Sequence, residues 1–135
     1  MESSTKSLSF YHSLGKLFYA IANADREVRE EEYQRLQRYV SDYWTAIDDL
    51  EDVMGEDAAH LIKVVFEGSD YFQLSSEETY RDFVDFRTTF PEYFTPEIDR
   101  LIFKTARAIA SSFSGMNKSE LVLLGKLKLF LNLAD

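Results

Sequence analysis

The sequence contains no cysteine, and its 135 residues include only 2 prolines, 5 glycines and 2 histidines. Without cysteine the chain can form no disulfide and no thiolate metal site, and it has no cysteine nucleophile. The scarcity of proline and glycine indicates few tight turns and long regular elements. No segment has the alternating pattern of a strand over a usable length, so an all-α fold is expected.

The chain is also short of positive charge. Its 15 Lys and Arg stand against 24 Asp and Glu, which gives a formal net charge of −9. This charge opposes binding to nucleic acid or to an anionic membrane surface, because both are polyanions. It suits cations, basic partners or simple solubility, and an unknown protein partner is expected. The N-terminus shows no secretory signal and no run is long enough to cross a membrane, so a cytoplasmic location is expected.

Apolar residues recur at helical spacing along most of the chain, as Phe10, Leu14, Leu17 and Ile21 do near its start. A hydrophobic content of 45% in a chain of this length fits one compact domain. We expect a flexible tail over residues 1–6 and a single bundle of about six helices over residues 7–135. The helices are expected over residues 7–23, from about 29 to 47, and over 57–67, 76–90, 96–113 and 118–131.

Three of these helix starts carry capping signals. A short polar side chain precedes the helix and a glutamate follows in its first turn, which satisfies the exposed backbone N–H groups. The three signals are Ser75-Ser76-Glu77-Glu78, Thr95-Pro96-Glu97 and Asn117-Lys118-Ser119-Glu120.

The most informative stretch runs from Ala20 to Glu32, where an apolar helix end is followed by an acidic turn and a second helix start. Asp25 stands where the chain leaves the first helix, and its short carboxylate suits a turn. Glu31 and Glu32 fall in the next first turn, where the helix dipole favours negative charge. Hard divalent cations need several oxygen ligands, so Asp25, Glu31 and Glu32 are candidate ligands for calcium, magnesium or zinc. The alternative is that these acids only cap the turn and are neutralised by the arginines among them.

The same pattern recurs near the C-terminus, where Ala108-Ile109-Ala110 repeats Ala20-Ile21-Ala22. In this register Glu120 takes the place of Glu32, and Phe113 replaces the acidic first residue of the turn. Matched small, apolar and glutamate positions predict two related helical halves. The further matched pairs are Met116 with Val28 and Leu124 with Leu36.

An Ala-Asp-x-x-Val-x-x-x-Glu turn after an Ala-Ile-Ala helix end, echoed in a second half, resembles the TerB-like domains of the tellurite-resistance family. The resemblance spans the chain from its first helix to its last. It implies an all-helical fold in two similar halves, a role as a stress-linked or membrane-proximal adaptor, and divalent metal bound by the acidic residues. The chain departs from the family pattern at Arg26, where the family has Gly, at Arg29, where it usually has Ser, Asp or Thr, and at Phe113, where it has a second Asp.

Two other acidic clusters have simpler explanations. Six acids within residues 48–57 fit a solvated surface, or a patch for a basic partner. Glu56 and Asp57 with His60 resemble half of a carboxylate–histidine metal site, but a di-iron bundle needs two Glu-x-x-His units. The sequence has no Gly-rich phosphate loop and no Gly-x-Ser-x-Gly elbow, so no enzymatic activity is expected.

Two apolar features are candidate protein-binding surfaces. The aromatic loop, Phe90 to Phe94, either fills the core or forms a docking patch with Tyr71 and Phe72. The last helix is apolar nearly all round, so we expect it at the centre of the bundle, with a partner-binding face as the alternative. The sequence thus predicts a non-catalytic TerB-like adaptor. Its alternatives are a metal-free interaction bundle that uses these two features, and a ligand-binding bundle with a deep pocket.

Overall fold

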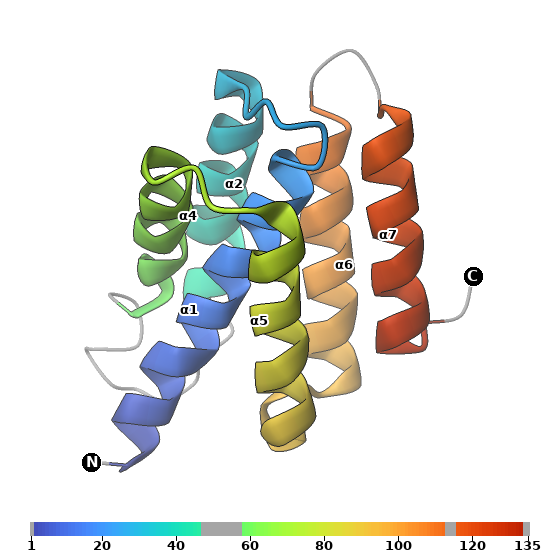
Figure 1. Ribbon diagram of the computed structural model, residues 1–135. Helices are drawn as coiled ribbons and strands as arrows, with labels where there is room; N and C mark the ends of the chain where they lie inside the picture. Colours follow the sequence, from blue (N-terminus) through green and yellow to red (C-terminus); the bar gives the residue numbers. More distant parts are fainter. Residues whose placement is uncertain (1, 47–57, 113–115, 134–135) are drawn as a thin grey trace.

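The computed structural model describes residues 2–46, 58–112 and 116–133. Over these residues the chain is helical without a strand, as the sequence predicted, and its helices gather in one compact bundle (Figure 1). Two short 3-10 helices, Trp44–Ala46 and Pro91–Tyr93, lie between the longer elements. The α-helices of the described residues are α1 (Glu2–Ala22), α2 (Glu30–Asp42), α4 (Leu61–Tyr71), α5 (Ser76–Thr89), α6 (Pro96–Ala110) and α7 (Lys118–Leu131).

Helix α1 is the central element of the bundle, where it contacts α4, α5, α6 and α7 (Figure 1). Its last six residues have no exposed face, because every side chain from Leu17 to Ala22 is fully buried. The polar group of Tyr19 is satisfied within this core, since its hydroxyl donates to the Leu74 carbonyl at 2.7 Å. Small residues along the helix let the neighbouring backbones come close.

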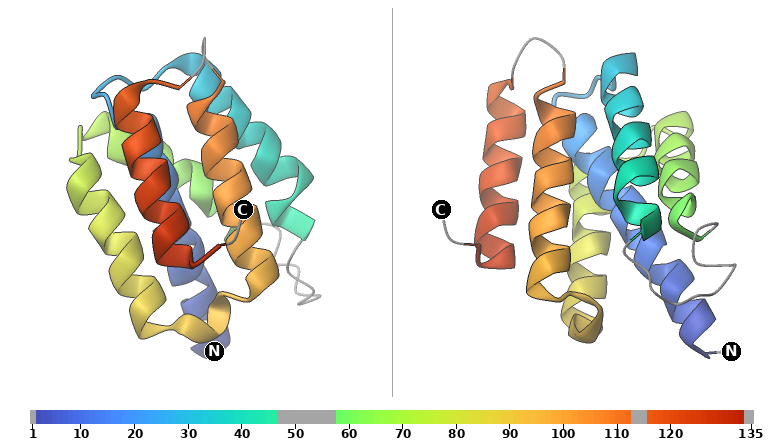
Figure 2. Two further views of the ribbon diagram at one scale, coloured as in Figure 1. Left: turned by 90° about the vertical axis from the view of Figure 1, so that its right-hand side faces the viewer. Right: turned by 180° about the vertical axis from the view of Figure 1, so that it is seen from behind.

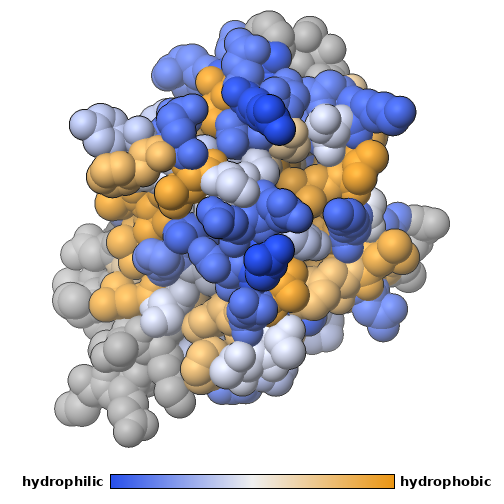
Figure 3. Space-filling model, in the orientation of Figure 1, coloured by the Kyte–Doolittle hydropathy of each residue, from blue (hydrophilic) through white to orange (hydrophobic). Residues whose placement is uncertain are grey.

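Helix α7 lies at the edge of the bundle, beside α6 (Figure 2). Leu124 and Leu127 are buried, whereas Leu121, Val122 and Leu129 are 52%, 53% and 82% exposed. Hydrophobic residues are visible over this edge in Figure 3. The prediction of a central last helix is therefore wrong. An apolar surface all round a helix leads to burial only if neighbours cover every side, and α7 is covered on one side.

The predicted helix boundaries differ from the structure mainly at three places. Helix α2 ends at Asp42, before the expected end near residue 47, and Trp44–Ala46 form a separate 3-10 helix. Helix α1 begins at Glu2, before the expected start at Ser7. Helix α4 continues through Gly68 to Tyr71, because a single glycine weakens a helix without ending it. The expected start of that helix, Asp57, lies outside the described residues.

The aromatic loop packs inward. Phe94 is 7% exposed, and its ring centroid lies 5.3 Å from that of Phe10. Tyr93 stacks on the same Phe10 ring at 5.6 Å. Phe94 and Tyr93 thus complete the core between α1 and α5, as the first of the two interpretations predicted, and they are not exposed as a docking patch. Tyr71 and Phe72, at the end of α4, are instead 80% and 72% exposed.

The three predicted N-caps are confirmed. The side-chain oxygens of Ser75, Thr95 and Asn117 each accept a backbone N–H from the first turn of the helix that follows. These bonds replace water at N–H groups that have no partner inside the helix, and so they fix where α5, α6 and α7 begin.

We expect Ser75→Ala to lower the free energy of unfolding by about 1 kcal/mol, because it removes the acceptor that the Glu78 N–H meets at 3.1 Å. Urea denaturation followed by circular dichroism measures this change. Ser119→Ala, on the exposed surface of the first turn of α7, is the control and is expected within about 0.5 kcal/mol of wild type. An equal loss of unfolding free energy in both variants would mean that the Ser75 cap does not stabilise the protein specifically.

Candidate functional site

The chain leaves α1 through a tight acidic turn. Asp25 Oδ1 accepts the backbone N–H of Glu27 at 3.1 Å, and Asp25 Oδ2 accepts the Arg29 guanidinium at 3.2 Å. Arg26 has a φ of 69°, in the left-handed region that residues other than glycine rarely adopt. Asp25 therefore holds the turn together, and Arg29 balances its charge.

Helix α2 begins directly after this turn with a buried acid. Arg29 is the N-cap residue, and its backbone N–H donates to Glu32 Oε1 at 2.7 Å. This bond draws Glu32 back over the helix start, where the residue is 1% exposed, whereas the adjacent Glu31 is exposed. The exposed N–H groups and the dipole favour a glutamate at this position, but burial of a bare carboxylate is costly.

Helix α7 begins with the same arrangement. Asn117 Oδ1 accepts the Glu120 backbone N–H at 2.8 Å, and the Asn117 backbone N–H donates to Glu120 Oε1 at 3.0 Å. Glu120 is 2% exposed. The Asn117 amide also donates to Asp25 Oδ2 at 2.7 Å, across 92 positions of sequence. Asn117 thus ties the start of α7 to the acidic turn after α1.

The two helix starts bring the carboxyl groups of Glu32 and Glu120 into a direct hydrogen bond. Burial, and after it the nearby Glu120, together raise the pKa of Glu32 to about 8, while the Arg29 backbone N–H and guanidinium oppose the rise. At neutral pH Glu32 therefore keeps its proton, next to the Glu120 side chain. We call the five residues that meet here the carboxylate junction: Asp25, Arg29, Glu32, Asn117 and Glu120.

The structure brings two of the three predicted metal ligands together. Asp25 and Glu32 belong to the carboxylate junction, while Glu31 lies outside it, exposed on α2. The sequence register matched Glu120 to Glu32, but Glu120 was not among the predicted ligands. This match was the signal from which Glu120 could have been placed in the site. In the described parts of the chain, no three His, Cys, Asp or Glu side chains are grouped to hold a metal ion.

The remaining sequence clusters add no described site. The acidic run within residues 48–57, with Glu56 and Asp57 of the candidate half-site, lies outside the described residues. His60 directly precedes α4, at its N-cap position. Among the described helices, none is long and apolar enough to cross a membrane.

Comparisons with known proteins identify no relative. No protein-family model matches the chain, and neither a curated protein nor a solved structure matches it significantly.

Proposed function

We propose that this chain is a non-catalytic, TerB-like interaction module in which the carboxylate junction is the element that responds to its surroundings. The observation that carries the proposal is the hydrogen-bonded pair Glu32–Glu120, buried between the start of α2 and the start of α7. A shared proton joins the two helix starts. Loss of that proton leaves two carboxylates in contact, which must separate or take up a cation.

Two observations support the TerB-like part of the proposal and its two related halves. Glu32 and Glu120, matched in the sequence register, each accept a hydrogen bond from the backbone N–H of the N-cap residue before their helix. Arg26 has a φ of 69° at the position where the family pattern has glycine, the residue that adopts this conformation most easily.

The junction offers a divalent cation two adjacent carboxylates, Glu32 and Glu120. Two carboxylates fit Mg²⁺ well, since that ion keeps several waters and takes few protein ligands. Asp25 is less available, because three N–H donors already occupy its oxygens. A cation would thus be held mainly by Glu32 and Glu120, with water completing its shell, and it would replace the proton as the bridge between α2 and α7.

The experiment is a backbone NMR titration with calcium, magnesium and zinc at about pH 8, near the pKa of Glu32. We expect saturable shifts centred on residues 23–33 and 116–121 in the wild type. They are abolished in Glu32→Gln, which keeps the shape of the side chain without its charge, and weakened in Asp25→Ala, which loses the anchor of Asn117. Glu31→Gln is the matched control and keeps the response. Flat or diffuse shifts in the wild type would remove the cation from the proposal.

A metal-free interaction bundle is the second candidate, and the exposed side of α7 favours it. Leu121, Val122 and Leu129 give this edge an apolar surface that no described element covers. The aromatic loop supports it less, because Phe94 is buried and Tyr93 packs against the core. A flat ion titration combined with a protein partner lost in Leu129→Glu would favour this candidate over the first.

A further inference from the structure

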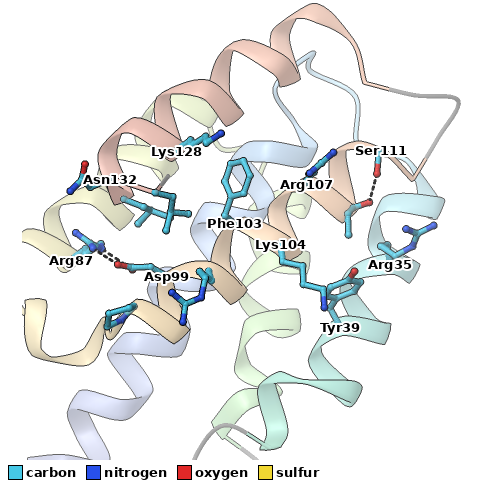
Figure 4. Close-up of a pocket in the computed structure, with 15 residues that line it drawn as sticks. Arg35, Tyr39, Arg87, Asp99, Phe103, Lys104, Arg107, Ser111, Lys128 and Asn132 are labelled. Carbon is cyan, nitrogen blue, oxygen red and sulfur yellow. Dashed lines mark hydrogen bonds and ion pairs between the residues drawn. The ribbon is translucent and has the colours of Figure 1, made fainter. Parts of the chain in front are cut away.

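A large groove runs along the outer side of α6, between α2 and α7 (Figure 4). Its volume is about 1120 Å³. Figure 4 shows Phe103 of α6 near the middle of the groove, between Lys128 of α7 and Arg107 of α6. Tyr39 and Arg35 of α2 lie on the opposite side. Leu133, just after α7, adds further apolar surface, and the buried Leu131 lies beneath it. The groove is neither the deep apolar nor the carboxylate-lined pocket of a ligand-binding bundle.

Positive charge is concentrated in this groove. Although acids outnumber bases in the chain, the described residues that line the groove include six Lys and Arg and one acid. That acid, Asp99, already accepts two hydrogen bonds from Arg87, from Nε to Oδ1 at 3.2 Å and from Nη2 to Oδ2 at 2.6 Å. We call this surface the basic groove; its cations are Arg35, Arg87, Arg100, Lys104, Arg107 and Lys128.

Four of these cations pair with no carboxylate of the described residues: Arg35, Arg100, Lys104 and Arg107. Arg100, Lys104 and Arg107 lie at positions i, i+4 and i+7 of α6, so they share one side of that helix. Like charges at this spacing repel and weaken the helix. A chain with this many acids could pair these three cations with its own carboxylates. Instead the three cations face the groove without such a partner among the described residues.

We propose that the basic groove binds an acidic, amphipathic peptide segment of a partner protein. The cations are spread over roughly 10 Å of α6 at 1.5 Å per residue, so they match a series of carboxylates along a chain. Phe103 and Leu133, both part-exposed, offer contact to apolar side chains of the same segment. This is the mode in which a helix lays its apolar side into a groove and charged residues fix its orientation.

Other anions fit the basic groove less well. A lone phosphate needs donors that converge on one point, whereas these cations are spaced in a row. Nucleic acid or an anionic membrane would extend past the groove and meet a chain of net charge −9. The inference rests on the proposed role as an interaction module and adds the chemistry of the partner.

The probe is a fluorescein-labelled synthetic peptide of 15 residues, the length of α6, with leucines on one helical side and glutamates elsewhere. Fluorescence anisotropy measures its affinity for the full chain at low salt. We expect saturable binding that weakens about 30-fold in the triple variant Arg100→Gln, Lys104→Gln, Arg107→Gln. The dependence of affinity on salt should also fall, because three charge contacts are gone.

The matched control removes the same charge elsewhere, by Arg81→Gln, Lys118→Gln and Lys126→Gln, all exposed on α5 and α7. It is expected to bind the peptide within about twofold of wild type, since distant charges are screened. A second control peptide has the same composition with its leucines scrambled, and it should bind several-fold more weakly. Thermal melts within roughly 3 °C of wild type would establish that both triple variants are folded.

Four results would overturn the proposal. These are equal losses in the two triple variants, equal affinity for the scrambled peptide, or no saturable binding up to about 1 mM peptide. The fourth is tighter binding of phosphatidylserine vesicles or a single-stranded oligonucleotide through the same three residues, which would assign the groove to a polyanion. None of these results bears on the ion titration of the carboxylate junction, so the two proposals can fail separately.

Discussion

Gly15→Ala is expected to destabilise the protein by roughly 2–3 kcal/mol, the cost of forcing extra atoms into a close-packed contact. Gly15 lies where α1 packs closely against α4. A Cβ at this position would lie 2.7 Å from Val65 Cβ and 2.8 Å from the Ile62 backbone oxygen. Neither neighbour can retreat by a simple change of side-chain rotamer, since one contact is to a β-carbon and the other to the backbone. The two helices must therefore separate, and α1 lies at the centre of the bundle.

Two other helical glycines provide matched controls. A Cβ added at Gly68 in α4 or at Gly125 in α7 meets nothing within 4 Å. Alanine at either position should therefore stabilise the protein, by up to about 1 kcal/mol, because it favours the helix and restricts the unfolded chain. Urea denaturation of the three variants compares them directly. Opposite signs for Gly15→Ala and the controls are expected, and a neutral Gly15→Ala would contradict the close approach.

The contrast between α1 and α7 explains which parts of the fold the sequence could predict. Helical spacing and capping residues identified the helices, because both signals depend on neighbours within a few positions. The position of each helix in the bundle depends on long-range packing. Small residues such as Gly15 and Ala20 let other helices surround α1, and the richer apolar surface of α7 remains half exposed.

The candidate site likewise combines features that the sequence predicts with features that depend on long-range packing. The capping role of Asn117 and the match of Glu120 with Glu32 could be read from the sequence. The hydrogen bond from Asn117 to Asp25 could not, because it joins residues 92 positions apart. The sequence also could not predict that Glu32 is buried while the adjacent Glu31 is exposed, because this difference depends on how α7 packs against α2. The charged row along α6 was present at helical spacing, but only the groove shows that its members share a concave surface.

Glu32→Gln is expected to remove a pH dependence of stability that the wild type shows between about pH 4.5 and about pH 8. The pKa of Glu32 is raised from 4.5 to about 8 in the folded chain. In this interval the folded protein holds a proton that the unfolded chain releases, so the free energy of unfolding falls as the pH rises. The contribution is complete below about pH 4.5, is lost on passing pH 8, and stays level above it.

Glutamine imitates the protonated glutamate at every pH. Its amide can donate to Glu120 as the Glu32 proton does, and its oxygen can accept the Arg29 backbone N–H. Wild type and Glu32→Gln should therefore be nearly equal near pH 5. At pH 8.5 the variant should be more stable by on the order of 3 kcal/mol, since one pKa unit corresponds to about 1.4 kcal/mol.

Urea denaturation at half-unit steps from pH 5 to 9 measures the difference between the two proteins, which cancels the titration of all other groups. Glu31→Gln is the matched control, because it removes the same charge from the exposed neighbour; its difference from wild type should stay within about 0.5 kcal/mol throughout. Parallel curves for wild type and Glu32→Gln would mean that Glu32 is ionised in the folded chain. The start of α2 and the start of α7 would then be held together by Asn117 and Asp25 alone, and the junction would have no proton to exchange for a cation.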